Sequence, residues 1–363
     1  MNINEIIKKV NELATKDVDE RGKINMATNL IFDDITSDNS ELKIGILEEI
    51  IDSDHIACAV DGSKYEIELS DVTLILARAV KILGKKKDKK SVPSEIAEDF
   101  KIIENYYDKN VISNKSILFM LSLETGLIEK CEDCDVIFVD GPIVDPPTYY
   151  EEDVEIENIL SLDKLALYRS TVLRRLKGKN KLIMGIVKNF SHRILIKEFL
   201  NSYPALIKAR ENYIISNIMY KYRLEKSEFN KPIFLGWINW DSLINNQIIL
   251  DDLKGISKAY NQYKKAFNYS LSIYSLYYQY NITSPIVRID MLSEKEPDFT
   301  PIKYLNTWAM QGIREVTLLN KLADELSEIN SQDAKKYALL FNLARENYLD
   351  MNDKLAELMM RKT

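Results

Sequence analysis

Residues 136–139 are four consecutive apolar side chains, Val-Ile-Phe-Val, followed at once by Asp140, Gly141 and Pro142. Strict alternation of apolar and polar residues would indicate a strand with one face in water. Continuous apolarity instead indicates a strand buried on both faces, in the middle of a sheet that helices cover. Gly141 and Pro142 end that strand in a turn. The chain is therefore expected to contain an α/β sheet whose central strand ends on a carboxylate.

Segments on either side of this strand supply the rest of the sheet. The elements expected between residues 56 and 202 are, in chain order, strands at 56–60, 65–69 and 72–82, a helix at 113–130, the strand at 136–140, a helix at 156–177, a strand at 182–187 and a helix at 192–202. The first strand is expected to end in a turn at Asp61, Gly62 and Ser63. Three antiparallel strands followed by alternating helices and strands is the order of the RNase H-like fold. We therefore expect an α/β fold with an RNase H-like mixed β-sheet flanked by helices.

The remaining segments are expected to extend this core. Residues 1–50 have helical apolar spacing, residues 232–240 and 285–292 have strand patterns, and a Tyr-rich segment at 269–280 leads into the second of these strands. The Tyr-rich spacing favours core packing over stacking on bases. From Tyr304 onward the chain reads as helical, with a break at residues 330–333. The expected division is 1–54 as an N-terminal helical segment, 55–310 as the RNase H-like domain, and 311–363 as C-terminal helices that pack on the domain or on a partner.

Composition excludes several classes of protein. The chain carries 49 basic and 56 acidic side chains, a net charge of −7, which argues against a protein that coats DNA by bulk charge. This net charge is compatible with a local basic channel for DNA, and the lysine- and arginine-rich segments 85–90 and 174–181 are candidates for it. No apolar run approaches the roughly 18 residues of a membrane span, and the charged N-terminus lacks the apolar centre of a signal peptide. We expect a cytoplasmic protein with no membrane partner.

Cysteine and histidine are scarce, which limits the chemistry further. The three cysteines fit a reducing compartment, and two histidines are too few for chemistry that needs several imidazoles. Cys131 and Cys134 have the spacing of a metal site, but no second pair or histidine accompanies them in the sequence. We therefore predict no zinc site there.

Three carboxylates carry the expected chemistry. Asp61 and Asp140 each end a strand and precede a glycine, and Glu124 lies on the helix between those strands. Side chains at strand ends face the crevice where α/β proteins bind ligands. Carboxylates gathered there would repel one another unless a cation lay among them, and oxygen ligands suit Mn²⁺ or Mg²⁺. Two such ions about 3.5–4 Å apart can clamp a phosphodiester.

Each of these signals also has a simpler explanation. An Asp-Gly pair after a strand is more often a turn than a ligand when it occurs alone, and two such pairs on different strands favour a site. Glu124 has acidic neighbours at residues 129, 132 and 133, so it reads equally as one of several solvated charges.

Four short motifs, in order, resemble those of the NurA nucleases. Residues 59–63 (AVDGS) are similar to the first acidic motif of that family, and residues 136–143 (VIFVDGPI) are similar to the second. Residues 184–189 (MGIVKN) resemble a strand that ends in lysine, and residues 285–290 (PIVRID) resemble an Arg-hydrophobic-acid strand. Each motif is short, and the ordered set, which spans residues 56–292, is far more specific than any single member.

The resemblance implies a function that the residues alone do not give. NurA proteins are Mn²⁺-dependent nucleases that resect DNA ends and cut single strands, form homodimers, and work with HerA, a hexameric ATPase that pumps DNA. Asp61, Glu124 and Asp140 carry over as metal carboxylates, and Lys188 as a contact to phosphate or to the developing charge. The expected partners are single-stranded and double-stranded DNA ends, a HerA-type ATPase and a second copy of the chain. No Walker A pattern is present, so any ATP dependence comes from a partner.

One departure from the family supports a rival function. The family has an active-site histidine after a Tyr-Pro segment near its C-terminus, whereas this chain has no histidine after His192. Tyr304, in the corresponding region, is the candidate substitute as a hydrogen-bonding catalytic group. The alternative to a nuclease is a catalytically weakened or inactive NurA-like subunit that binds DNA or serves as an adaptor of a translocase complex.

Overall fold

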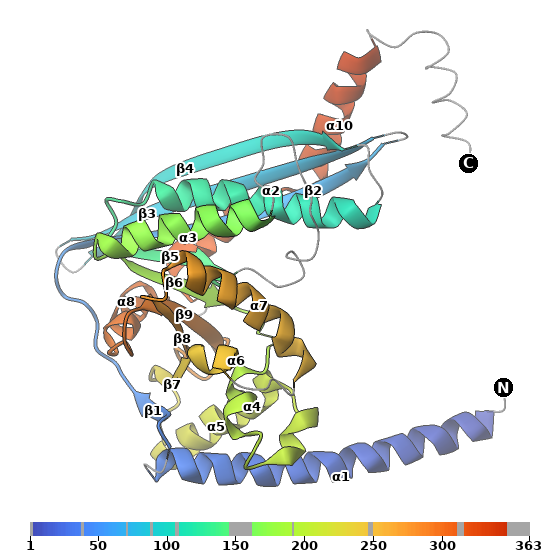
Figure 1. The fold of residues 1–363 in the computed structure, drawn as a ribbon, viewed down its shortest axis with the longest axis vertical. Coiled ribbons are helices and arrows are strands. Elements are labelled where there is room, and N and C mark those ends of the chain that lie inside the picture. The colour runs from blue at the N-terminus through green and yellow to red at the C-terminus, as the bar shows by residue number, and fades with distance from the viewer. Residues whose placement is uncertain are drawn as a thin grey trace.

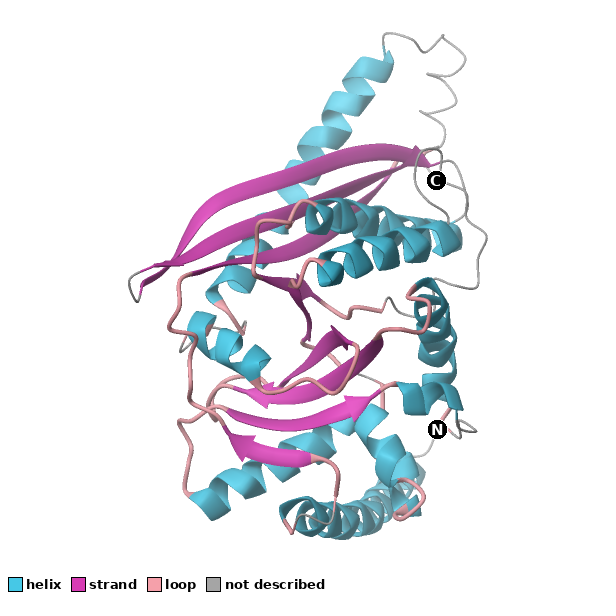
Figure 2. Cartoon of the chain, turned by 60° about the vertical axis from the view of Figure 1, so that its left-hand side comes forward, coloured by secondary structure: helices cyan, strands magenta, loops and turns pink. Residues whose placement is uncertain are grey.

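The structure is a computed structural model. It describes residues 3–37, 40–69, 72–87, 90–105, 109–144, 162–190, 192–245, 250–310 and 316–346. Within these ranges one mixed sheet of nine strands runs through the molecule in the order β1-β7-β8-β9-β6-β5-β2-β3-β4 (Figure 1). Figure 2 shows its strands forming a continuous twisted layer. No helix in the described part of the chain is long and apolar enough to cross a membrane.

The RNase H-like part of the sheet is built from the chain's first half. Its elements are β2 (His55–Glu68), β3 (Thr73–Lys87), β4 (Lys90–Asn105), α2 (Lys109–Glu129), β5 (Val136–Asp140), α3 (Leu162–Gly178) and β6 (Leu182–Val187). The first three strands pair antiparallel in a meander. β5 then pairs parallel with β2, and β6 pairs parallel with β5. The strand β5 is thus central and buried, as its continuous apolar sequence predicts.

The other elements extend this sheet and cover it. They are α1 (Ile3–Thr36), β1 (Lys43–Ile46), α4 (Ile194–Phe199), a 3₁₀ turn (Pro204–Lys208), α5 (Glu211–Lys226), β7 (Ile233–Asn239), α6 (Asp241–Asn245), α7 (Asp251–Ala266), β8 (Ser272–Gln279), β9 (Val287–Ser293), α8 (Thr300–Trp308), α9 (Leu318–Ser327) and α10 (Ser331–Glu346). Side chains of α1 to α7 form the core on one face of the sheet. Side chains of α8 and α9 form a second core on the other face.

The predicted turn at residues 61–63 is wrong, because these residues lie in the middle of β2, a strand of 14 residues. Asp61 pairs with Val80 and Gly62 with Ala79, without interruption. The reason for a glycine here is packing: a Cβ at residue 62 would lie 2.7 Å from Oε1 of Glu124 on α2. Gly62 therefore makes room for an acidic side chain and does not end a strand. Since residues 65–68 belong to β2, the third strand of the meander is β4, which the sequence analysis did not predict.

Three further predictions can be compared with the structure. Residues 43–46 were expected to be helical and instead form β1, which pairs with β7, so that a short edge strand follows α1. The Tyr-rich segment forms β8, and all eight of its side chains are buried. The preference for core packing in that segment is confirmed. A break between two helices is confirmed near the predicted position, at residues 328–330, and Asn330 caps α10 by accepting from the amides of Gln332 and Asp333, which already belong to that helix.

Candidate metal centre

The register of the parallel strands brings Asp61 and Asp140 together. Val60 on β2 pairs with Val139 on β5, so the next residue on each strand is an aspartate at the same height of the sheet. Asp61 is buried, and the Asp140 side chain is 20% exposed. Two residues 79 positions apart in the sequence therefore place their carboxylates side by side where β5 ends.

A third carboxylate reaches this pair from α9. Oxygen atoms of Asp61, Asp140 and Asp324 all lie within 4.8 Å of one another. The helix is seated on β2 partly by Ser327, whose hydroxyl donates a 2.8 Å hydrogen bond to Oδ2 of Asp61. The sequence analysis missed Asp324, because an acidic residue on an amphipathic helix reads as a solvated charge. Only the packing of α9 distinguishes Asp324 from its neighbour Glu325.

Lys188 supplies positive charge to this carboxylate cluster. It follows directly after β6, the parallel neighbour of β5. Its ammonium lies 3.1 Å from Oδ1 of Asp140 and 3.6 Å from Oδ1 of Asp324. The strand-end lysine predicted from the sequence therefore stands between two of the three carboxylates.

Glu124 lies beside the carboxylate cluster and forms an ion pair with Arg169 on α3. Its side chain fills the space that a Cβ on residue 62 would need. Its Oε2 lies 3.4 Å from the guanidinium of Arg169. Both side chains of this pair are almost fully buried. Arg169 also donates to the carbonyl of Pro142, in the turn that follows Asp140. Glu124 is thus held next to Asp61 with its charge matched by Arg169.

The electrostatics of the cluster favour a bound cation. Burial, and then the negative charge of Glu124, raise the pKa of Asp61. Burial, and then the charge of Asp61, raise the pKa of Asp140. Oδ1 of Asp140 is buried and accepts no well-aligned hydrogen bond from the described residues, although Lys188 is close. Hard oxygen donors with an excess of negative charge are the ligand set of Mg²⁺ or Mn²⁺, so the residues fit such an ion.

Tyr304 lies at the opposite end of the same strands. Its ring packs edge-on against His55, the first residue of β2, with ring centroids 5.0 Å apart. Burial, and then the charge of Asp135 just before β5, raise the pKa of its hydroxyl. β5 is five residues long, so its two ends are about 15 Å apart at the usual strand rise. The structure does not bring Tyr304 to the carboxylates.

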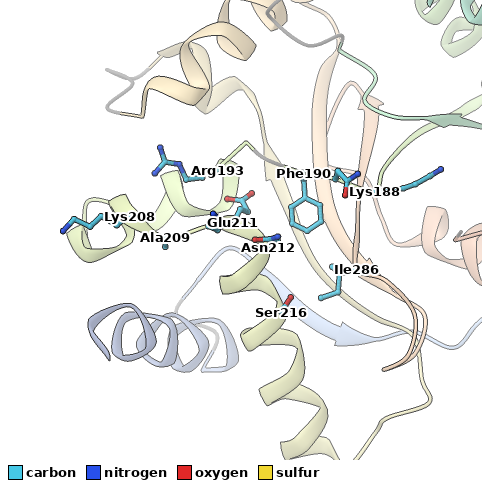
Figure 3. Close-up of a pocket in the computed structure, with 11 residues that line it drawn as sticks. Lys188, Phe190, Arg193, Lys208, Ala209, Glu211, Asn212, Ser216 and Ile286 are labelled. Carbon is cyan, nitrogen blue, oxygen red and sulfur yellow. The ribbon is translucent and has the colours of Figure 1, made fainter. Parts of the chain in front are cut away.

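A groove of about 740 Å³ begins at Lys188. Figure 3 shows Lys188 at one end of it and Lys208 at the other, with Arg193 and Glu211 between them. Arg210 also lines this groove, which therefore carries four basic side chains. Sequence reasoning missed it, because these residues come from separate segments. Paired side chains occur in the predicted basic runs, such as Arg175 with Glu129 and Lys179 with Glu132, and also in this groove, where Lys208 pairs with Glu20.

Comparison with known proteins gives one family. The family model described as "NurA domain" matches residues 55–329. The NurA nuclease from Sulfolobus solfataricus has a similar fold, with a TM-score of 0.59 at 13% identity over 96% of this chain and 99% of that one. A structure of NurA bound to dAMP and manganese gives a TM-score of 0.55 at 11% identity, over 98% of this chain and 100% of that one. No curated protein matches the sequence.

Proposed function

This chain belongs to the NurA family, whose domain covers residues 55–329, and we propose that it is a metal-dependent nuclease that hydrolyses phosphodiesters at DNA ends. The observation that carries the proposal is the convergence of Asp61, Asp140 and Asp324 within 4.8 Å. Mn²⁺ is the proposed cofactor, with Mg²⁺ as the substitute, because a solved NurA structure is described as bound to dAMP and manganese.

Each residue of the centre has a distinct role in the proposed reaction. Divalent cations bound here would supply two-metal chemistry, in which a water is activated and the departing oxygen is stabilised. Asp61 and Asp140 would hold the cations from the rigid sheet, and Asp324 would hold them from α9. Ser327 fixes the orientation of the Asp61 carboxylate through its hydrogen bond. Glu124 acts as a positioning residue behind Asp61, since Arg169 already binds it.

Lys188 is the proposed contact to the substrate phosphate. Its ammonium is at the cluster, and the residue lies at one end of the basic groove. Negative charge grows on the phosphoryl oxygens in the transition state, and a fixed cation at that point stabilises it. The proposed path of the DNA backbone therefore leads from the carboxylates past Lys188 into the groove.

Removal of cations is the primary test of the nuclease proposal. We expect cleavage of single-stranded and blunt double-stranded DNA with Mn²⁺, weaker cleavage with Mg²⁺, and none with EDTA. Re-addition of Mn²⁺ should restore cleavage, which separates metal loss from denaturation. DNA binding without cleavage under every cation would instead support the rival function, an inactive DNA-binding or adaptor subunit. Cleavage that persists in EDTA would contradict the metal mechanism.

Asp324 is tested against its exposed neighbour on the same helix. Replacing Asp324→Asn removes a charged donor from the cluster, so we expect the Mn²⁺ concentration for half-maximal activity to rise roughly tenfold or more. Glu325→Gln is the matched control, because Glu325 is on α9 but pairs with Lys321. Equal effects of the two changes would show that general charge on α9, and not ligation by Asp324, matters.

The groove is tested by removing charge at its far end. We expect Lys208→Gln with Arg210→Gln to weaken single-strand binding, and to reduce the slope of log K against log salt by about 0.7 per lost phosphate contact. The matched control is Lys101→Gln with Lys335→Gln, two exposed lysines on β4 and α10. Titrations across a range of salt concentrations give both quantities. Identical salt slopes for the two double variants would place the DNA outside the groove.

The proposed partners follow from the family and not from contacts in the chain. We propose a homodimer that works with a HerA-type hexameric ATPase in the resection of double-strand breaks. α1 extends beyond the body of the molecule (Figure 1), and Ile7, Val10 and Leu13 on it are all more than half exposed. An apolar row of this kind is a candidate contact surface. The proposed division of the chain remains 1–54, 55–310 and 311–363.

A further inference from the structure

Three cysteines meet in the core, away from the carboxylates. Cys58 comes from β2, Cys131 follows the end of α2, and Cys134 precedes β5. Each is a free cysteine with no exposed surface, and their three sulfur atoms lie within 4.8 Å of one another. The sequence analysis weighed only the Cys131 and Cys134 pair and predicted no zinc site. The fold adds Cys58, 73 residues earlier in the chain, as a third donor.

Local geometry around the sulfurs resembles that of a binding loop. Cys131 and Cys134 are joined by a tight turn, in which the Cys134 amide donates to the Cys131 carbonyl at 3.1 Å. This turn aims both side chains at β2. Thiolate sulfurs around a tetrahedral zinc at about 2.3 Å lie about 3.8 Å apart, so the three sulfurs need shift by only about 1 Å to share an ion.

Positive charge beside the cluster offsets the charge that metal-bound thiolates carry. Nζ of Lys81 donates to the carbonyl of Lys130, next to Cys131. This ammonium therefore lies one residue from the turn that carries Cys131, where it can balance part of the negative charge of bound thiolates.

We propose that Cys58, Cys131 and Cys134 bind a thiophilic cation, Zn²⁺ or Cu⁺, as a structural site. Among the described residues, no histidine or carboxylate joins the cluster, so the three sulfurs match three-coordinate Cu⁺ directly, whereas Zn²⁺ would need a fourth donor such as a water. Soft sulfur donors select these ions over the hard Mn²⁺ or Mg²⁺ of the carboxylate cluster. The two metal sites therefore differ in donor chemistry, and each can be loaded or removed without the other.

The position of the cysteines indicates what the ion does. Cys58 is three residues before Asp61 on β2 and pairs with Ile137, three residues before Asp140 on β5. An ion bound by all three sulfurs ties β2, the end of α2 and the start of β5 together, about 10 Å along the strands from the two aspartates. Since ligands that bind only the folded chain stabilise it, loss of the ion lowers thermal stability and loosens the strands that carry the carboxylates.

The test is the metal content of the full-length protein. Protein purified from zinc-supplemented or copper-supplemented cells, without chelator, is analysed by mass spectrometry. We expect one zinc or copper per chain, retained in gel filtration, and a more than tenfold drop in Cys131→Ser. The matched control is the Asp61→Asn and Asp140→Asn double variant, which removes hard ligands and should keep the thiophilic ion. Chain loaded with Co²⁺ alone should show thiolate-to-cobalt charge-transfer absorption, which does not depend on activity.

A second measurement covers the case in which Cys131→Ser fails to fold. Titration of the wild-type protein with an organomercurial, in the presence of a zinc or copper indicator, should release the ion as the thiols react. Several results overturn the proposal: no thiophilic ion with three reactive thiols in denaturant, a single reactive thiol because two cysteines form a disulfide, or an ion that Cys131→Ser retains. The nuclease test is independent, since it uses Mn²⁺ and DNA cleavage.

Discussion

Replacing Asp140→Asn is expected to lower the rate of DNA cleavage on the order of 10³-fold, about 4 kcal/mol of transition-state stabilisation. Asn keeps the shape of the side chain and removes its charge. Asp140 ends β5 next to Asp61, and burial has already raised the pKa of both carboxyls. Once Asn replaces Asp140, Asp61 loses the neighbouring carboxylate that would help it to bind a divalent cation. Asp61→Asn should have an effect of the same size, because the two carboxylates lie close enough to hold the same ions.

The measurement is a cleavage assay under saturating Mn²⁺ with a binding control beside it. Asp54→Asn is the matched control, since Asp54 is exposed in the loop just before β2. Mn²⁺ should raise the Tm of the wild-type chain and of Asp54→Asn, and should leave Asp140→Asn nearly unchanged. An Asp140→Asn protein that cleaves DNA within a few-fold of the wild-type rate would refute the assigned centre.

The second large effect is on stability, at a buried ion pair on β9. Arg288 and Asp290 are 1% and 0% exposed, and two nitrogens of the guanidinium lie 2.8 and 2.9 Å from the two carboxylate oxygens. Ser275 on β8 also donates to Asp290, and Trp240 donates to Ser275. This network joins β9 to β8 and to the loop after β7. The Arg-hydrophobic-acid motif thus builds the sheet and lies outside the carboxylate cluster.

Asp290→Ala should lower the free energy of unfolding by about 3–5 kcal/mol, because it leaves Arg288 charged and buried without this partner. Urea denaturation monitored by circular dichroism measures the loss. The double variant Arg288→Met with Asp290→Ala should be more stable than Asp290→Ala alone, since it no longer buries the orphaned charge. If the double variant were the less stable of the two, burial of an unmatched charge could not be the cause.

Secondary structure is predicted most accurately from the sequence where the residues of one segment are sufficient to specify it. The apolar run before Asp140 identifies a central strand by itself, and the position of Asp140 follows from it. The Asp61-Gly62 pair shows the limit of that reasoning. The same two residues are typical of a turn, and only the approach of Glu124 from α2 explains why the glycine lies within a strand. Asp61 does lie in the carboxylate cluster, but the turn from which it was predicted is absent.

Residues that depend on distant packing were beyond prediction. Asp324 joins the cluster only because α9 lies on β2, and Cys58 meets its partners only because β2 pairs with β5. The four basic residues of the groove come from after β6, from the 3₁₀ turn and from the start of α4 and α5. Neither spacing nor local pattern relates these positions. Tyr304, chosen from its place in the chain, lies beside His55 at the far end of β2.

The carboxylate cluster takes its oxygen donors from two parts of the structure that differ in local stability, the central strands and the helix α9. Asp61 and Asp140 belong to paired strands in the middle of the sheet, which are the last parts of a domain to open. Asp324 belongs to a ten-residue helix, α9, which three residues separate from the start of α10. Fraying of that helix would withdraw one oxygen donor and the hydroxyl that steadies Asp61, while the strands stayed intact. Cation affinity should therefore fail on heating before the sheet itself melts.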